Sequence, residues 1–116
     1  MAIDALEAVD IILQLENFIE EIRPEEEEIR KQLDYGYTIE NQSILLHEIR
    51  PDWQHREIIR QYPFAKTTYV KRQRIWKIYW IRSNLKWYAY DPRPAVKSLK
   101  QFLEIVKADE YHCFFG

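Results

Sequence analysis

The sequence predicts a single α+β domain, in which an antiparallel sheet of about five strands carries an N-terminal helix, a short second helix and a C-terminal helix packed on one face. Apolar residues recur at helical spacing near both ends of the chain, and they alternate with polar residues in two stretches, 35–48 and 64–90. A proline-rich segment at 91–94 separates the alternating region from the last helix. The 116 residues suffice for one hydrophobic core with a radius of gyration of about 13 Å.

The first segment predicts an amphipathic helix with glutamates on its outward face. Its apolar stripe is formed by Ala8, Ile11, Ile12, Leu15, Phe18, Ile19 and Ile22. Pro24 ends this helix, because proline removes an amide donor and clashes with the preceding turn, and we expect it to begin the second helix. The acidic run at 25–28 then suits the positive end of that helix's dipole. An acidic docking tail is the less economical interpretation of this run.

From position 35 the period changes to alternation, which predicts a hairpin with a tight turn at 41–42. One face of this hairpin carries Tyr35, Tyr37, Ile39, Ile44, Leu46 and Glu48. Gly36 lies inside the first strand and indicates a bulge or a close approach to the backbone. After Pro51, the polar stretch 52–61 predicts a loop or short helical turn that is anchored by Trp53.

Three further strands are predicted at 64–71, 75–81 and 85–90, joined by two-residue turns at 72–73 and 83–84. This pairing places Tyr69 opposite Trp76, and it places Trp80 opposite Trp87. The nearly uncharged face is assigned to the core and carries Ala65, Thr67, Tyr69, Trp76, Ile78, Trp80, Trp87 and Ala89. The opposite face carries Lys66, Thr68, Val70, Lys77, Tyr79, Ile81, Lys86, Tyr88 and Tyr90.

The last predicted element is a helix after the prolines. Its apolar stripe is Val96, Leu99, Phe102, Leu103 and Val106, and its outward residues are Lys97, Lys100 and Glu104. The closing tail contains Phe114 and Phe115, which are too apolar to remain in water. We therefore expect the tail to pack on the sheet or on a neighbouring subunit.

Charge is strongly segregated along the chain although the net charge is only −2. Residues 1–34 hold eleven acidic and three basic side chains, a net charge of −8, whereas residues 58–90 hold eight basic side chains and no acidic one. Attraction between a helical and a sheet surface, within one chain or across a dimer, accounts for this pattern. A basic patch for an anionic partner is the alternative.

The sequence predicts neither an enzyme nor a cofactor site. The polar candidates are His47, Glu48, Asp52, His55, His112 and Cys113, and their spacings match no catalytic or metal-binding motif. The two glycines, Gly36 and Gly116, exclude a glycine-rich phosphate loop. One cysteine forms no intrachain disulfide, and no window resembles a leader or a membrane span, so we expect a cytoplasmic protein.

A set of framework motifs resembles the uncharacterised bacterial family called domain of unknown function 3024. The motifs are Tyr62-Pro63-Phe64-Ala65, Trp76-Lys77-Ile78-Tyr79-Trp80, Asn84-Leu85, Tyr90-Asp91 and Phe114-Phe115-Gly116, with Arg23-Pro24, Glu48, Arg50 and Trp53. The resemblance spans almost the whole chain and implies a small cytoplasmic α+β domain without an assigned activity. The family pattern has Asp-Arg before the turn asparagine and a histidine in the last strand, where this chain has Arg82-Ser83 and Tyr88. Any chemical task of that histidine would be absent here.

The predicted function is a non-catalytic protein-interaction or homodimerising module, with a second copy or another protein as its partner. The candidate interaction face comprises Lys66, Lys77, Tyr79, Lys86, Tyr88 and Tyr90. Single-stranded nucleic acid is the alternative ligand, because rings on a sheet can stack on bases while lysines contact phosphates. The pI near 5.9 makes this alternative the weaker one.

Overall fold

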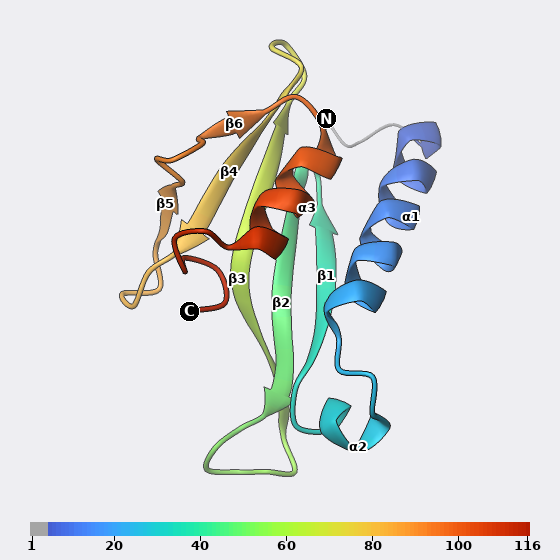
Figure 1. Ribbon diagram of the computed structural model, residues 1–116, viewed down its shortest axis with the longest axis vertical. Coiled ribbons are helices and arrows are strands. Elements are labelled where there is room, and N and C mark those ends of the chain that lie inside the picture. The colour runs from blue at the N-terminus through green and yellow to red at the C-terminus, as the bar shows by residue number, and fades with distance from the viewer. Residues whose placement is uncertain (1–4) are drawn as a thin grey trace.

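The structure is a computed structural model that describes residues 5–116, with side chains from Glu7 onward. Its elements are α1 (Ala5–Ile22), α2 (Glu27–Arg30), β1 (Asp34–Glu40), β2 (Ser43–Pro51), β3 (Ile59–Val70), β4 (Ile75–Ile81), β5 (Trp87–Ala89), β6 (Ala95–Val96) and α3 (Leu99–Ala108). The strands form one antiparallel sheet in the order β1-β2-β3-β4-β5, and β6 pairs with β4 (Figure 1). The predicted α+β fold is confirmed.

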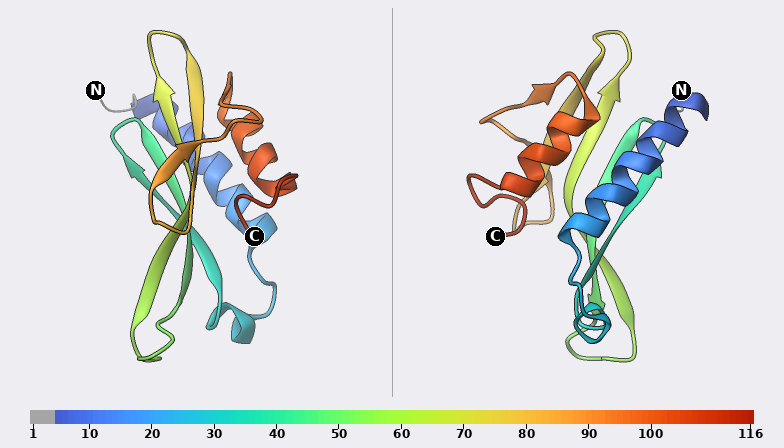
Figure 2. Two further views of the ribbon diagram at one scale, coloured as in Figure 1. Left: turned by 90° about the vertical axis from the view of Figure 1, so that its left-hand side faces the viewer. Right: turned by 45° about the vertical axis from the view of Figure 1, so that its right-hand side comes forward.

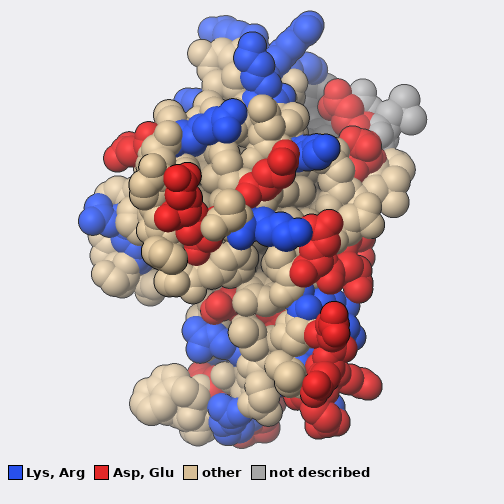
Figure 3. All heavy atoms as spheres, viewed as in Figure 1, with Lys and Arg blue, Asp and Glu red and all other residues tan. Residues whose placement is uncertain are grey.

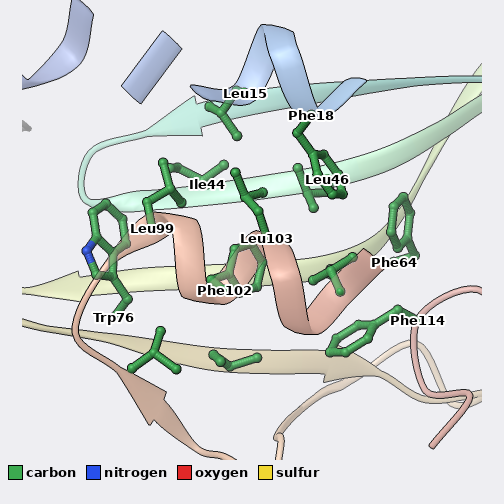
Figure 4. Packing of buried hydrophobic residues seen from close by; sticks show 14 of the residues in the cluster. Leu15, Phe18, Ile44, Leu46, Phe64, Trp76, Leu99, Phe102, Leu103 and Phe114 are labelled. Carbon is green, nitrogen blue, oxygen red and sulfur yellow. The ribbon is translucent and has the colours of Figure 1, made fainter. Parts of the chain in front are cut away.

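Helices α1 and α3 lie on the same side of the sheet (Figure 2). The hydrophobic core fills the space between these helices and the sheet, and its fully buried side chains include Leu15, Ile44, Leu46, Ile78 and Phe102 (Figure 4). Burial of these apolar surfaces is the main stabilising term of the fold. In residues 5–116, no helix combines the length and the apolar composition that crossing a membrane requires.

The first two predicted hairpins have the expected register. Tyr37 pairs with Leu46 across β1 and β2, and Tyr69 pairs with Trp76 across β3 and β4. The β1–β2 turn is at Asn41-Gln42, as predicted, and Asn41 adopts a left-handed φ of 53°. The turn between β3 and β4 keeps the predicted register although it spans four residues, 71–74. Alternating burial sets both registers, because a slip of one residue would move every core side chain into water.

The predicted register of β4 and β5 is wrong by one residue. Trp80 pairs with Tyr88 and Ile81 pairs with Trp87, whereas the sequence prediction paired Trp80 with Trp87. The physical reason is a three-residue loop in place of a two-residue turn. The amide of Leu85 donates to the carbonyl of Arg82 at 2.8 Å, and Leu85 then adopts a left-handed φ of 63°. Trp87 and Ala89 therefore leave the predicted core face.

Strands β2 and β3 continue beyond the helices as a long arm. The sequence predicted a loop at 52–61, but β3 already begins at Ile59. Asp52, rather than Trp53, holds the short connecting loop, because its carboxylate accepts hydrogen bonds from the Gln54 amide at 2.8 Å and from Arg60 at 2.5 Å. Trp53 is 77% exposed. The arm extends the molecule to 44 Å and raises its radius of gyration to 14.6 Å.

The helices differ from the prediction in three places. Glu26 is extended, so α2 begins at Glu27 and not at Pro24. Ile12 is exposed and does not widen the core stripe of α1. Val96 is buried as predicted, but it belongs to β6, and α3 begins after Ser98, whose hydroxyl accepts a hydrogen bond from the Gln101 amide.

The C-terminal tail packs on the helix-covered side of the sheet. Asp109 ends α3 in a left-handed conformation, and its buried carboxylate accepts hydrogen bonds from the amides of Phe114 at 3.0 Å and Phe115 at 2.9 Å. The ring of Phe115 lies 5.0 Å from the ring of Phe64 and 5.9 Å from that of Tyr35. The predicted packing of the tail on the sheet is confirmed.

Candidate functional site

The candidate site is the sheet face opposite the helices, which we call the outer sheet face. Its side chains alternate along the strands with the buried ones, and no described helix covers it (Figure 2). The outer sheet face consists of Ser43, Leu45, Lys66, Thr68, Lys77, Tyr79, Ile81, Trp87 and Ala89. It combines aromatic and aliphatic side chains with two lysines, and Glu40 of β1, which pairs with Ser43, adds one carboxylate at its side.

Lys66 lies at the centre of this face. Its ammonium group is 5.1 Å from the ring centroid of Tyr79 and 5.5 Å from that of Trp87. Cation–π attraction to both rings holds the lysine against the sheet. A groove of about 620 Å³ runs beside it, lined by Glu40, Asn41, Gln42, Ser43, Leu45, Lys66, Thr68 and Trp87. In its floor the hydroxyls of Ser43 and Thr68 are hydrogen-bonded at 2.7 Å.

The structure brings three of the six predicted site residues together. Lys66, Lys77 and Tyr79 lie on the outer sheet face. Lys86 lies in the exposed turn between β4 and β5. Tyr88 and Tyr90 were predicted for the same face and are placed on the other side, because the three-residue loop reverses the orientation of β5.

Tyr88 and Tyr90 have structural surroundings of their own. The guanidinium of Arg82 lies 4.7 Å from the ring centroid of Tyr88, whose hydroxyl also accepts a hydrogen bond from Asn84 at 2.7 Å. Tyr90 is only 3% exposed, its ring lies 5.0 Å from that of Phe114, and burial raises the pKa of its hydroxyl. Tyr90 therefore belongs to the core and anchors the tail.

Trp87 is the site residue that sequence reasoning missed. It was assigned to the core because a two-residue turn placed it opposite Trp80, but it pairs with Ile81 and faces outward. The unusual element is Leu85, since the left-handed conformation required in this loop is favoured by glycine and asparagine. No feature of the residue type at position 85 indicates that conformation.

The polar candidates for catalysis lie in three separate regions. His47 is on β2, and Glu48, the next residue, points to the opposite face and lies 3.4 Å from Arg50. Asp52 and His55 are in the loop at the end of the arm. His112 and Cys113 are in the tail.

The immediate surroundings of these groups are mostly apolar or structural. His47 is 5% exposed, burial lowers the pKa of its imidazole, and its Nδ1 atom makes no hydrogen bond to a described residue. Burial, with a smaller effect of Asp109, raises the pKa of the Cys113 thiol and so disfavours the thiolate. Within residues 7–116, no three His, Cys, Asp or Glu side chains are grouped so that they could hold a metal ion.

The segregated charges occupy different parts of the surface. Acidic side chains follow α1 and α2, and basic side chains gather at the turn between β3 and β4 (Figure 3). Some of these charged side chains form ion pairs between elements. Arg23 at the end of α1 contacts Asp34 of β1 at 2.5 Å, and Lys107 of α3 contacts Glu21 of α1 at 2.7 Å. On the outer sheet face, the ammonium group of Lys66 lies close to the rings of Tyr79 and Trp87.

A comparison with protein families identifies a family to which the chain is similar. The family model described as "Domain of unknown function (DUF3024)" matches residues 3–116, which is nearly the full length. A search of curated proteins and a search of solved structures gave no match.

Proposed function

The chain belongs to the DUF3024 family, and we propose that it is a non-catalytic module whose outer sheet face binds an acidic segment of another protein. The observation that carries this proposal is the arrangement of the layers. Both long helices cover one side of the sheet, and the other side presents Tyr79, Trp87 and Lys66 to solvent. Half-buried aromatic residues beside a cationic side chain are typical of the central residues of protein interfaces.

The charges of the face define the partner. Lys66 and Lys77 lie on it, Lys86 lies in the adjacent turn, and the groove is lined by one acidic residue, Glu40, opposite Ser43. A segment with carboxylates would find complementary potential here, and its apolar side chains would cover Leu45 and Trp87. The same lysines would repel a basic segment, so charge also contributes to the specificity of binding.

A peptide selection tests this proposal. A displayed random peptide library is selected against the immobilised full chain, and the affinity of the selected peptides is measured by fluorescence anisotropy. We expect enrichment of peptides that combine Asp and Glu with aromatic or aliphatic residues. Lys66→Glu should weaken their binding about tenfold or more, because it replaces an attractive contact with a repulsive one.

The matched control is Lys100→Glu, which makes the same charge change on the exposed side of α3. It should leave the affinity nearly unchanged. Equal affinities of wild type and Lys66→Glu for the selected peptides would reject the outer sheet face as the binding surface, as would a selection that enriches basic peptides.

Single-stranded nucleic acid is a second candidate, favoured by the position of Lys66 between two rings on a sheet. The loss of Tyr88 and Tyr90 from the face leaves two rings for stacking, Tyr79 and Trp87. Titration with oligo-deoxythymidine and oligo-uridine at low and high salt tests this candidate. Absence of salt-sensitive binding at micromolar protein would reject it.

A further inference from the structure

We propose that this protein forms a symmetric homodimer through the outer edge of β1 and an exposed apolar stripe of α1, the residues Val9, Ile12 and Leu13. This surface is distinct from the outer sheet face. The partner is a second copy of the same chain, whose β1 would pair antiparallel with β1 and whose α1 would lie beside α1.

Strand β1 is an edge strand, since no other strand of the described chain pairs on its outer side. The two-residue turn makes Glu40 and Ser43 a hydrogen-bonded pair, so the backbone groups of Tyr37 and Ile39 point away from β2. The amide of Tyr35, which has the same orientation, donates to the carboxylate of Asp34 at 2.8 Å, as this alternation requires. The outward amides of Tyr37 and Ile39 are therefore oriented to pair with another strand.

The two edges of the sheet differ in their protection. At the far edge, β5 has three residues and β6 has two, and Pro92 and Pro94 lie between them. Strand β1 has seven residues, its register with β2 is continuous, and its sequence contains no proline, lysine or arginine. Short strands, prolines and inward charges are the usual devices against edge pairing. The strands are thus short and interrupted at one edge, whereas β1 at the other edge is long and has no strand of residues 5–116 on its outer side.

The apolar stripe of α1 lies on the flank of that open edge. Val9, Ile12 and Leu13 are 60%, 42% and 58% exposed. Glu16, one turn after Ile12, accepts a hydrogen bond at 2.7 Å from the hydroxyl of Tyr37 on β1. The side of α1 that carries Ile12 and Glu16 is therefore the side next to β1. The opposite flank of α1, with Gln14 and Asn17, borders the groove toward α3.

Two-fold symmetry satisfies both surfaces at once. An axis perpendicular to the sheet would bring β1 against its copy and keep both α1 helices on the same side, so that the two stripes meet. An unrelated extended peptide would pair with the strand but leave the stripe in water. A second copy supplies a strand and an apolar helix in the same relative position.

Sedimentation equilibrium of the full chain, from low micromolar to near-millimolar concentration, tests the proposal. We expect a reversible monomer–dimer equilibrium. Leu13→Glu should raise its dissociation constant about tenfold or more, because it places a charge in the apolar contact. The control Leu85→Glu makes the same change at a leucine that is 79% exposed in the turn beside the far edge, and it should have no effect.

Hydrogen exchange and salt dependence complete the test. The amides of Tyr37 and Ile39 should gain protection as the dimer fraction rises, because they pair only across the interface. High salt should not weaken the dimer, since it screens the repulsion between two acidic α1 helices. It should, in contrast, lower the affinity of acidic peptides for the outer sheet face. The proposal would be overturned if the protein were a monomer at every concentration, or if Leu13→Glu did not change the dissociation constant of the dimer. Neither result would contradict the proposal that Lys66 contributes to peptide binding.

Discussion

The imidazole of His47 lies over Gly36, so that a Cβ atom at position 36 would come within 2.9 Å of the Cε1 atom of His47. The two residues are direct neighbours across β1 and β2. The sequence prediction of a bulge or close approach at Gly36 is resolved in favour of a close approach, because the register of β1 and β2 is regular at this pair. The ring of His47 then closes over the backbone of β1 on the outer side of the sheet.

Gly36→Ala should therefore reduce the free energy of unfolding by about 1–3 kcal/mol, as expected for an inserted methyl group without space. The same substitution made in a His47→Ala background should cost much less. Chemical denaturation of the four proteins in this double-mutant cycle measures the coupling. Equal costs of Gly36→Ala with and without the imidazole would contradict the contact.

Acidification should destabilise the protein through His47. Burial lowers the pKa of this imidazole from its usual 6.5, so below that value the unfolded chain binds the proton more readily than the folded chain. The free energy of unfolding should consequently fall as the pH drops below about 6.5.

His47→Asn should flatten this part of the pH profile. The control is His55→Asn, which changes an exposed histidine in the loop of the arm. Thermal denaturation of both variants across this pH range provides the measurement. If the pH profile flattened with His55→Asn but not with His47→Asn, the pH dependence would not come from His47, and the prediction would be contradicted.

The pair of Arg23 and Asp34 fastens the end of α1 to the start of β1. Two hydrogen bonds join the side chains, at 3.1 Å and 2.5 Å, and both groups are partly buried. Asp34→Asn should cost about 1.5–3 kcal/mol in the free energy of unfolding, as is typical of charged hydrogen bonds. Glu28→Gln, which removes an exposed pair with Lys31, should have little effect.

The same pair predicts an acid-sensitive contribution. Although burial acts to raise the pKa of Asp34, hydrogen bonds from Arg23 and the Tyr35 amide lower it below its usual value. The stabilisation is present above the unfolded-state pKa, near 3.8, and is lost as the pH falls through the lower pKa of the folded state. Asp34→Asn should remove this part of the acid dependence in denaturation curves measured at low pH.

The tryptophans separate the two sheet faces. Trp76 is buried in the core (Figure 4), and Trp76→Ala should reduce the free energy of unfolding by about 3–5 kcal/mol. Trp87→Ala should cost less than half as much, because this ring lies on the outer sheet face. Chemical denaturation of both variants checks the orientation of β5, and a cost for Trp87→Ala equal to that for Trp76→Ala would contradict it.

Alternation and helical spacing sufficed to predict most of the fold. The face shared by Tyr37 and Leu46, and the pairing of Tyr69 with Trp76, follow from side chains that must avoid water. The arm was not predicted, because residues 52–61 show no alternation. The strands of the arm are held together by backbone hydrogen bonds, and its loop is held by hydrogen bonds to Asp52. Neither kind of interaction produces a periodic pattern in the sequence.

The candidate site was predicted only where strand parity was correct. Lys66, Lys77 and Tyr79 follow β3 and β4, whose register the buried side chains determine. Tyr88, Tyr90 and Trp87 depend on the length of one loop. A leucine in a left-handed conformation determines that length, and a single added loop residue exchanges the two faces of the following strand.

The indole NH signals of the four tryptophans in an amide NMR spectrum test the central claim most directly. During titration with a selected acidic peptide, the signal of Trp87 should shift progressively. The signals of buried Trp76 and of Trp53 at the end of the arm should stay in place. Unchanged Trp87 together with a shifting Trp53 would contradict the account and assign binding to the arm instead of the outer sheet face.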